Sequence, residues 1–257
     1  MAARGSKYRR RRGRFGVLYK MLSVLLILAA IVGGCIVFFR VEKIAVAGST
    51  TYTEQQIIDV SGVEMEDNLF LIRKVPTGRK ILNALPYIKT VNIRRELPNG
   101  LAITVTECVP VAALAGEEST WWILDSSAKL LEQGDKTLAR PFMKITGLTA
   151  LKPAAGGRVA VSVEEATKLD SLKSILSALE ERGMYADVDS VDLSAAAEIR
   201  MVYLDHYIVH MPLYSDDFHR LIHTMQVVAD HPKVAGRPGT IDLTLEKPSF
   251  IPANVTF

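Results

Sequence analysis

Histidines are the residues of this sequence whose type and spacing could bind a metal ion. His219 and His223 stand four apart in a predicted helix, so both rings face one side, as in many zinc sites. His206 and His210 alternate along a predicted strand and share one face of it. No acid or thiol completes a site, and Arg220 replaces the glutamate of an H-E-x-x-H motif. The sequence therefore favours histidines with a structural role and predicts neither a metal ion nor a cofactor.

One short motif resembles a catalytic nucleophile. Ser126-Ser127-Ala128-Lys129 matches S-x-x-K, the pattern of penicillin-binding enzymes. Here the motif falls in a predicted hairpin turn instead of at a helix start, and no K-T-G follows it. The chain contains no G-x-S-x-G, P-loop or dinucleotide fingerprint. Its carboxylates are scattered, without a pair in an apolar setting for acid–base work. We therefore expect a protein that is not an enzyme; a metal-dependent exported hydrolase is the competing interpretation.

A basic arm precedes an uncharged apolar run at the start of the chain. Residues 1–20 hold eight lysines and arginines and no acid, and residues 21–39 hold no charge. A helix of that length rises roughly 29 Å, close to the hydrocarbon thickness of a bilayer. Basic flanks stay on the cytoplasmic side. The sequence thus predicts a cytoplasmic arm (1–20), a transmembrane helix (21–39) and an extracytoplasmic body, in a single-pass protein of the cell membrane.

Other interpretations of this N-terminus fit less well. A cleaved signal peptide has a shorter apolar core and small residues at its end, whereas Phe38-Phe39-Arg40 follows here. Val32-Gly33-Gly34-Cys35 loosely resembles a lipobox, but the next residues are apolar instead of a polar tether. The basic arm could bind nucleic acid, yet topology and contact with anionic lipid explain it more simply. No nucleic-acid partner is therefore predicted.

The first part of the body, residues 41–109, predicts a compact α+β unit. A strand at 41–48 is followed by a helix at 54–60, which Thr53 and Gln56 open as a capping box. A second helix is expected at 77–85. Two alternating runs then flank Asn99-Gly100, the pair typical of a type I′ hairpin turn. The predicted order is β-α-α-β-β, a three-stranded sheet with two helices on one face.

The second part, residues 110–247, predicts a mainly antiparallel sheet with two helices, followed by a tail at 248–257. A capping box at Ser162 opens a long amphipathic helix that ends at Gly183, and Ser215 caps a helix at 216–229. The expected strands lie at 121–124, 129–132, 141–145, 188–193, 199–204, 207–212 and 240–245.

Several stretches in combination resemble the FtsQ/DivIB family of bacterial cell-division proteins. They are I-A-V-A-G-S-T-T-Y-T-E-Q-Q-I (44–57), N-L-F-L-I (68–72), L-P-Y-I-K-T-V-N-I-R-R-E-L-P-N-G-L-A-I-T-V-T-E-C-V-P-V-A (85–112), W-W-I-L-D-S-S-A-K-L-L (121–131), R-P-F-M-K-I-T-G (140–147) and G-T-I-D-L-T (239–244). The sequence departs from the family pattern at Tyr87, Cys108 and Thr244.

This resemblance implies a polypeptide-transport-associated (POTRA) domain at 41–109 and the family's β domain at 110–247. It implies no catalysis. It implies a scaffold at the division septum that binds two other single-span proteins, of the FtsL and FtsB/DivIC type, and that couples early division proteins to the septal peptidoglycan synthases. POTRA units also occur in protein-transport and envelope-assembly factors, which is the alternative function.

The expected mechanism of partner binding is β-augmentation. The last predicted strand lies late in the chain, no covering helix follows it, and an edge strand offers unpaired N–H and C=O groups that a partner segment can extend. By analogy with the family, the partner docks on this strand and just beyond it. The predicted partner-binding residues are Ile241, Leu243, Leu245, Phe250 and Ile251.

Overall fold

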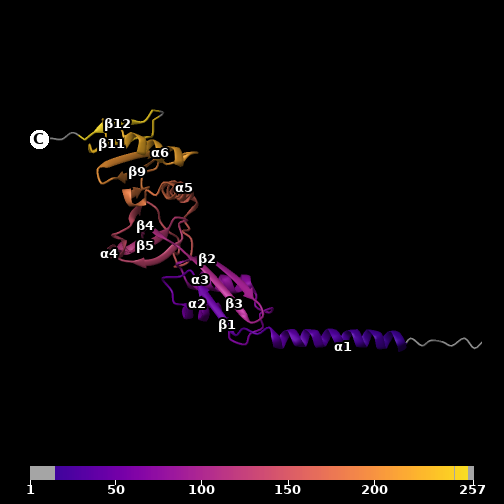
Figure 1. The fold of residues 1–257 in the computed structure, drawn as a ribbon. Helices are drawn as coiled ribbons and strands as arrows, with labels where there is room; N and C mark the ends of the chain where they lie inside the picture. The colour runs from indigo at the N-terminus through magenta and orange to yellow at the C-terminus, as the bar shows by residue number, and fades with distance from the viewer. Residues whose placement is uncertain (1–14, 246, 254–257) are drawn as a thin grey trace, which may run out of the picture.

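The computed structural model describes residues 15–245 and 247–253. Most of the predicted basic arm, residue 246 and residues 254–257 of the predicted tail lie outside the described residues. Helix α1 (Phe15–Phe38) projects from one end of the folded body, which consists of two sheet-containing units in succession (Figure 1). Residues 16–34 of α1 are exposed, and α1 is long and apolar enough to cross a membrane.

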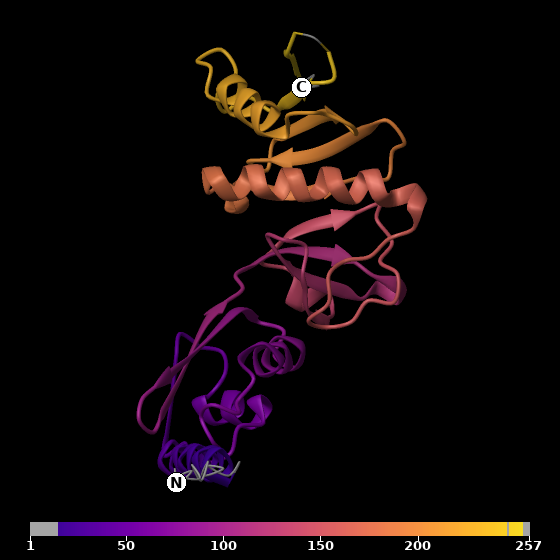
Figure 2. The same ribbon diagram turned by 90° about the vertical axis from the view of Figure 1, so that its right-hand side faces the viewer.

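The first unit has the predicted β-α-α-β-β order. Its sheet has the order β1-β3-β2, with β1 parallel and β2 antiparallel to β3. Figure 2 shows its two helices on the same side of this sheet. Ile57 and Ile81 of the helices pack with Ile93 and Ile103 of the sheet. The elements are β1 (Lys43–Ala47), α2 (Glu54–Ser61), α3 (Lys74–Ala84), β2 (Ile88–Glu96) and β3 (Gly100–Glu107).

Local sequence signals decide the ends of α2. The backbone N–H of Gln56 donates to Thr53 Oγ1, and the N–H of Thr53 donates to Gln56 Oε1, at 3.2 and 2.9 Å. This is the predicted capping box, which satisfies two N–H groups that the helix itself leaves free. The helix ends at Gly62, whose left-handed φ of 66° suits glycine.

The β2–β3 hairpin exists as predicted, but the type I′ turn at Asn99-Gly100 is wrong. Gly100 already belongs to β3 and pairs with Glu96, so residues 97–99 make the connection, with a cis Leu97-Pro98 bond. Gly100 has no positive φ; it is required because a Cβ there would lie 2.9 Å from the Glu96 carbonyl oxygen.

The second unit is one nine-stranded sheet of order β12-β11-β10-β9-β8-β7-β4-β5-β6. The β4–β7, β7–β8 and β10–β11 pairs are parallel and the other five are antiparallel, so the sheet is mainly antiparallel, as predicted. Its strands are β4 (Pro110–Ala115), β5 (Trp121–Asp125), β6 (Leu130–Gly134), β7 (Met143–Thr146), β8 (Val188–Asp192), β9 (Glu198–Tyr203), β10 (Tyr207–Pro212), β11 (Gly239–Asp242) and β12 (Ser249–Pro252).

Three helices accompany this sheet, one more than predicted. The additional α4 (Lys136–Ala139) is a single turn, too short for a periodic sequence signal. Helices α5 (Ala166–Arg182) and α6 (Phe218–Ala229) are the two expected ones, and the described residues contain six helices in all. Short 3₁₀ turns occupy Glu117–Ser119, Val163–Glu165 and Tyr185–Asp187.

Two predicted helix caps are wrong. The Ser162 side chain makes no capping hydrogen bond; the chain forms a 3₁₀ turn there, and the Glu165 carboxylate accepts the N–H of Thr149 instead. Ser215 does not cap α6 either. It accepts the N–H of Asp217, and Asp217 is the N-cap, which accepts the N–H of Arg220 at 2.9 Å. At Ser215 a local partner, the N–H of Asp217, competes with the helix for the serine side chain.

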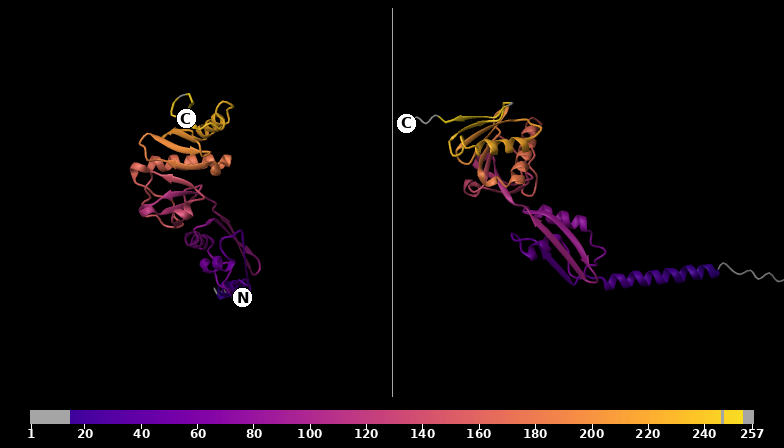
Figure 3. Two further views of the ribbon diagram at one scale, coloured as in Figure 1. Left: turned by 90° about the vertical axis from the view of Figure 1, so that its left-hand side faces the viewer. Right: turned by 45° about the horizontal axis from the view of Figure 1, so that its top comes forward.

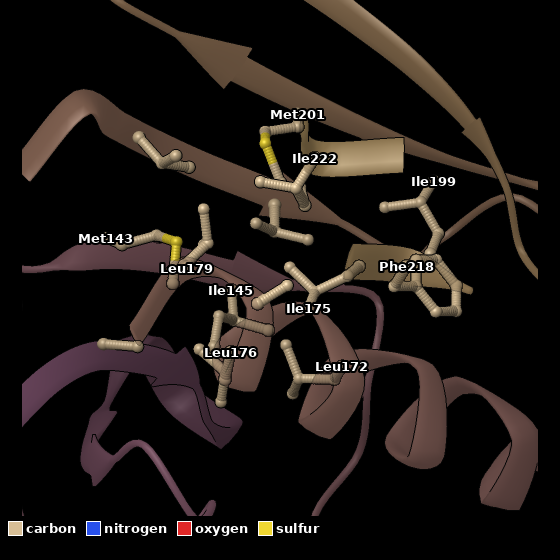
Figure 4. Close-up of a cluster of buried hydrophobic side chains, with 14 of the residues drawn as sticks. Met143, Ile145, Leu172, Ile175, Leu176, Leu179, Ile199, Met201, Phe218 and Ile222 are labelled. Atoms are coloured by element: carbon tan, nitrogen blue, oxygen red, sulfur yellow. The ribbon is translucent and has the colours of Figure 1, made fainter. Parts of the chain in front are cut away.

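The main core lies between the sheet and the two long helices, which cross the same face of the sheet (Figures 2 and 3). It is mainly aliphatic, as the low aromatic content of the chain predicts. Figure 4 shows side chains from β7, β9, α5 and α6 converging there. The labelled residues are Met143, Ile145, Leu172, Ile175, Leu176, Leu179, Ile199, Met201, Phe218 and Ile222.

A junction formed by residues 86–88, Cys108 and β6 joins the two units. The N–H of Cys108 donates to the Tyr87 carbonyl at 2.7 Å. Lys129 Nζ donates to the Ile88 carbonyl at 2.8 Å, and the Tyr87 hydroxyl donates to the Glu132 carboxylate. Burial raises the pKa of Cys108 to about 11, so the thiol is protonated at neutral pH and packs as an apolar group. Its neighbours in this small core are Ala113, Ile123, Leu131 and Ala139.

Glu107, at the end of β3, holds the loop that leads from β1 to α2. Its carboxylate accepts the hydroxyls of Ser49 and Thr50 at 2.6 and 2.7 Å, and the N–H groups of Thr50 and Thr51 at 2.9 and 2.8 Å. Burial alone would raise the pKa of Glu107, but the bonds from Ser49, Thr51 and Thr50 outweigh burial and lower that pKa to about 2.

We expect Glu107→Gln to lower the free energy of unfolding of the first unit by about 2 kcal/mol, because an amide accepts fewer of these donors and presents its own N–H groups to them. Urea unfolding of the chain in detergent measures this. The matched control is Glu117→Gln, since Glu117 is exposed and its carboxylate forms no hydrogen bond or ion pair with the described residues. Equal stability of Glu107→Gln and the control would contradict the role of Glu107.

The stability that Glu107 provides should also depend on pH. The folded pKa is lowered from 4.5, so this contribution is complete above pH 4.5 and is lost as the pH falls toward about 2. We therefore expect the stability difference between the wild type and Glu107→Gln to shrink between these pH values. A difference that stays constant from pH 6 to about pH 2.5 would show that the carboxylate charge is not the cause.

Candidate partner-binding edge

The C-terminal edge of the large sheet is formed by β12, not by the strand that the sequence predicts, and β6 forms the opposite edge. The predicted edge strand at 240–245 is wrong: β11 stops at Asp242 and is paired on both sides, parallel with β10 and antiparallel with β12. The chain turns back after residue 242 and adds β12 as the last strand. Among the described residues, no strand pairs with the outer side of β12.

Phe250 anchors β12 to the sheet. Its ring meets the ring of Tyr207 edge-on, with centroids 6.3 Å apart. Tyr207 is 1% exposed and is itself fixed, because its hydroxyl donates to the Val234 carbonyl and accepts the N–H of Gly236, both at 3.1 Å. A Cβ at Gly239 would lie 2.6 Å from the Phe250 ring and from the Ile251 carbonyl oxygen. Glycine is therefore required for β12 to approach β11.

The five predicted partner-binding residues divide into two groups. Ile241 and Leu243 are 0% and 4% exposed and belong to the main core, so a partner cannot reach their side chains. Phe250 is half-buried against that core. Leu245 and Ile251 are 60% and 57% exposed. The structure thus leaves two apolar side chains of the predicted set on the surface.

Sequence reasoning missed Ile208, which lies in the same row as Ile251. Ile208 pairs with Thr240, and Thr240 pairs with Ile251, so the three side chains point to one face. Helices α5 and α6 cover the opposite face, and Ile208 is 43% exposed. A sequence signal for an exposed Ile208 exists in β10, because Tyr207, Val209 and Met211 take the buried positions on either side of it. Ile208 is itself apolar, however, so the usual alternation of apolar and polar residues is not visible at this position.

A polar row lies beside this apolar pair. Ser249, Asp242, His210 and Arg200 follow each other across four strands on the same face. Asp242 accepts the hydroxyl and the N–H of Thr244 at 2.6 and 2.8 Å, and these bonds lower the pKa of Asp242. The edge therefore offers a partner apolar contacts from Leu245, Ile208 and Ile251, with a polar margin.

The residues singled out for chemistry are not assembled into a site. No group of three His, Cys, Asp or Glu residues that could hold a metal ion occurs within residues 15–245 and 247–253. His219 and His210 lie 2.8 and 3.0 Å from Glu181 and Glu198, respectively, as separate pairs. In the S-x-x-K motif, Ser126 donates to Glu180, whereas Lys129 donates to the Ile88 carbonyl.

The fold defines a POTRA-containing protein with one helix able to cross a membrane. Residues 39–107 match the family model of the FtsQ-type POTRA domain. Cell division protein FtsQ of Geotalea daltonii is 33% identical over 115 residues, which are 44% of this chain and 40% of that protein. Cell division protein FtsQ of Corynebacterium glutamicum is 32% identical over 97 residues, 37% of this chain and 43% of that protein. The chain therefore contains an FtsQ-type POTRA domain and is similar to proteins of the FtsQ/DivIB family.

A longer match extends this similarity into the second unit. Cell division protein DivIB of Clostridium acetobutylicum is 22% identical over 209 residues, which are 81% of each chain. The chain spans only about two fifths of the FtsQ proteins of Geotalea and Corynebacterium. The family model covers only the POTRA domain, so the assignment of an edge at β12 rests on the structure.

We expect Phe250→Ala to lower the free energy of unfolding by about 2 kcal/mol, because the ring is half-buried and its removal leaves a gap beside Tyr207. Ile251→Ala, a neighbouring change of an exposed side chain, should stay within about 0.5 kcal/mol of the wild type. Thermal and urea unfolding measure both. Equal effects of the two substitutions would show that β12 is not anchored by Phe250.

Proposed function

We propose that this chain is a membrane scaffold for bacterial cell division, which binds other single-span division proteins at the outer edge of β12. The FtsQ-type POTRA domain and the relatives named FtsQ and DivIB support a role in division. The family resemblance gives the partners, which are proteins of the FtsL and FtsB/DivIC type, and through them the septal peptidoglycan synthases. Helix α1 anchors the scaffold, with its N-terminus in the cytoplasm and the body outside.

The observation that carries the partner proposal is the open edge of β12. A strand with an unpaired side presents N–H and C=O groups that an extended partner segment can pair with. Ile251 and Ile208 supply apolar contact on the uncovered face, where the partner's alternate side chains can pack. Leu245, in the connection from β11 to β12, is a further exposed apolar side chain.

The hydrogen bonds and ion pairs of the side chains that could do chemistry fit a scaffold better than an enzyme. His210, His219 and the S-x-x-K residues Ser126 and Lys129 are used in separate ion pairs and hydrogen bonds. The Glu107 carboxylate, whose pKa is shifted strongly, is saturated by loop donors and closes the POTRA domain. A role as a transport or envelope-assembly factor has no observation of this structure in its favour.

We expect Ile251→Arg to weaken binding of the partner segment about tenfold or more, because a charge on the edge repels strand addition and removes an apolar contact. The matched control is Val163→Arg, since Val163 is 94% exposed and lies in the 3₁₀ turn that precedes α5, outside β12. Binding is measured by titrating labelled FtsB/DivIC-type and FtsL-type ectodomains onto the full chain in nanodiscs.

The same variants can be tested in cells that are depleted of the wild-type protein and given a fluorescent wall precursor. Val163→Arg should restore septal labelling, and Ile251→Arg should leave filaments without septa. Normal septation of depleted cells would contradict the division role. Division rescued fully by Ile251→Arg, with wild-type binding, would contradict only the β12 edge.

A further inference from the structure

An exposed apolar surface surrounds the point where the chain leaves α1. It comprises four side chains, which we call the exit patch. Their exposed fractions are 67%, 52%, 75% and 61%. Large apolar side chains in such a group are costly in water unless something covers them. They come from the end of α1, the loop after α2 and the tip of the β2–β3 hairpin: Phe38, Phe70, Leu71 and Leu97.

Hydrogen bonds fix the loop of the exit patch to the end of α1. The N–H of Leu69 donates to the Phe39 carbonyl at 2.9 Å, and the N–H groups of Val41 and Glu66 bond to the carbonyls of Asp67 and Val41 at 2.9 Å each. The Phe39 ring meets the rings of Phe38 and Phe70 edge-on, with centroids 5.3 and 5.0 Å apart. Phe70 therefore contacts Phe39, the residue that follows α1, directly.

The hairpin tip is held at the same place. The Asn99 carbonyl accepts the N–H of Glu42 at 2.9 Å, just after the chain leaves α1 (Figure 1). The Arg95 side chain donates to the carbonyls of Leu69 and Ile72, and its guanidinium lies 5.8 Å from the centroid of the Phe70 ring. Arg95 thus donates hydrogen bonds to the loop carbonyls, while the side chains of Phe70 and Leu71 remain exposed.

We propose that the exit patch docks on the lipid surface of the membrane that α1 crosses, with Phe70, Leu71 and Leu97 in the interfacial layer. The inference rests on membrane insertion of α1, which is part of the proposed function. Lipid is the expected binding partner because the exit patch adjoins the end of the apolar helix α1, whose last residue is Phe38. A bilayer that surrounds α1 therefore lies next to the side chains that are fixed beside this end. Aromatic and aliphatic side chains on fixed loops suit this boundary.

Docking of the exit patch is apolar and not electrostatic. The exposed acids Glu64, Glu66 and Asp67 stand near the exposed cations Arg40, Arg73 and Lys74, so the local charges balance. Glu66 lies 3.5 Å from Arg40 and neutralises it in part. Insertion into the interface therefore does not require anionic lipid, and salt does not screen it. It restrains the tilt of the POTRA domain against the membrane and so sets the height of β12 above it.

The full chain in neutral phosphatidylcholine liposomes tests this directly, with a nitroxide label on a single cysteine in a Cys35→Ala, Cys108→Ala background. We expect the Leu71→Cys label to be several-fold more accessible to oxygen, relative to an aqueous nickel complex, than a label at the exposed Val163→Cys. The ratio at Leu71 should stay the same in low and high salt. A ratio equal to that of Val163, or one that falls in high salt, would overturn the docking.

A label at Leu26→Cys in α1 separates the two hypotheses. If Leu26 is oxygen-accessible and Leu71 is aqueous, α1 is inserted and the exit patch alone is overturned. If Leu26 is aqueous as well, the membrane anchor of the proposed function fails together with the exit patch. High oxygen accessibility of the labels at both Leu26 and Leu71 supports docking. High oxygen accessibility of a label at Leu97→Cys under the same conditions extends the docked surface to the hairpin tip.

Discussion

The hydrogen bond from the backbone N–H of Cys108 to the Tyr87 carbonyl ties the chain to the start of β2 just before it enters the second sheet. On one side of this bond Glu107 closes the POTRA domain by accepting the donors of the β1–α2 loop. On the other side Lys129 and Glu132 of the second unit bond to residues 87 and 88. The orientation of the large sheet relative to α1 depends on this short junction, because both units contribute polar groups that burial obliges to pair.

This junction separates the end of the molecule that carries α1 from the end that carries β12. The exit patch lies where α1 meets the POTRA domain, and β12 lies at the far end of the large sheet (Figure 1). In the proposed function, a scaffold that recruits single-span partners holds its binding edge at a set distance from the bilayer. The two separately packed cores suit this role, because each end of the molecule belongs to its own core.

The two departures from the family pattern at Tyr87 and Cys108 become intelligible together. The sequence shows them as unrelated substitutions more than twenty positions apart. In the structure they are hydrogen-bonded neighbours: the Tyr87 hydroxyl reaches Glu132, and the Cys108 thiol is buried among Ala113 and Ile123. Burial, followed by the bond to Glu132, raises the pKa of Tyr87, so the phenol remains a donor across the junction at neutral pH.

The sequence by itself determined the features that arise from neighbours along the chain. The uncharged run of α1, the Thr53–Gln56 capping box and the alternation of β2 and β3 depend on spacing within a few residues. Only the tertiary structure decided that β12 is the edge, because this depends on Phe250 finding Tyr207 more than forty residues away. It also decided that Lys129 bonds across the junction, and that the loop carrying Phe70 and Leu71 and the tip of the β2–β3 hairpin are both bonded to the chain just after α1. Such contacts depend on which distant segments pack together, and local propensity carries no record of them.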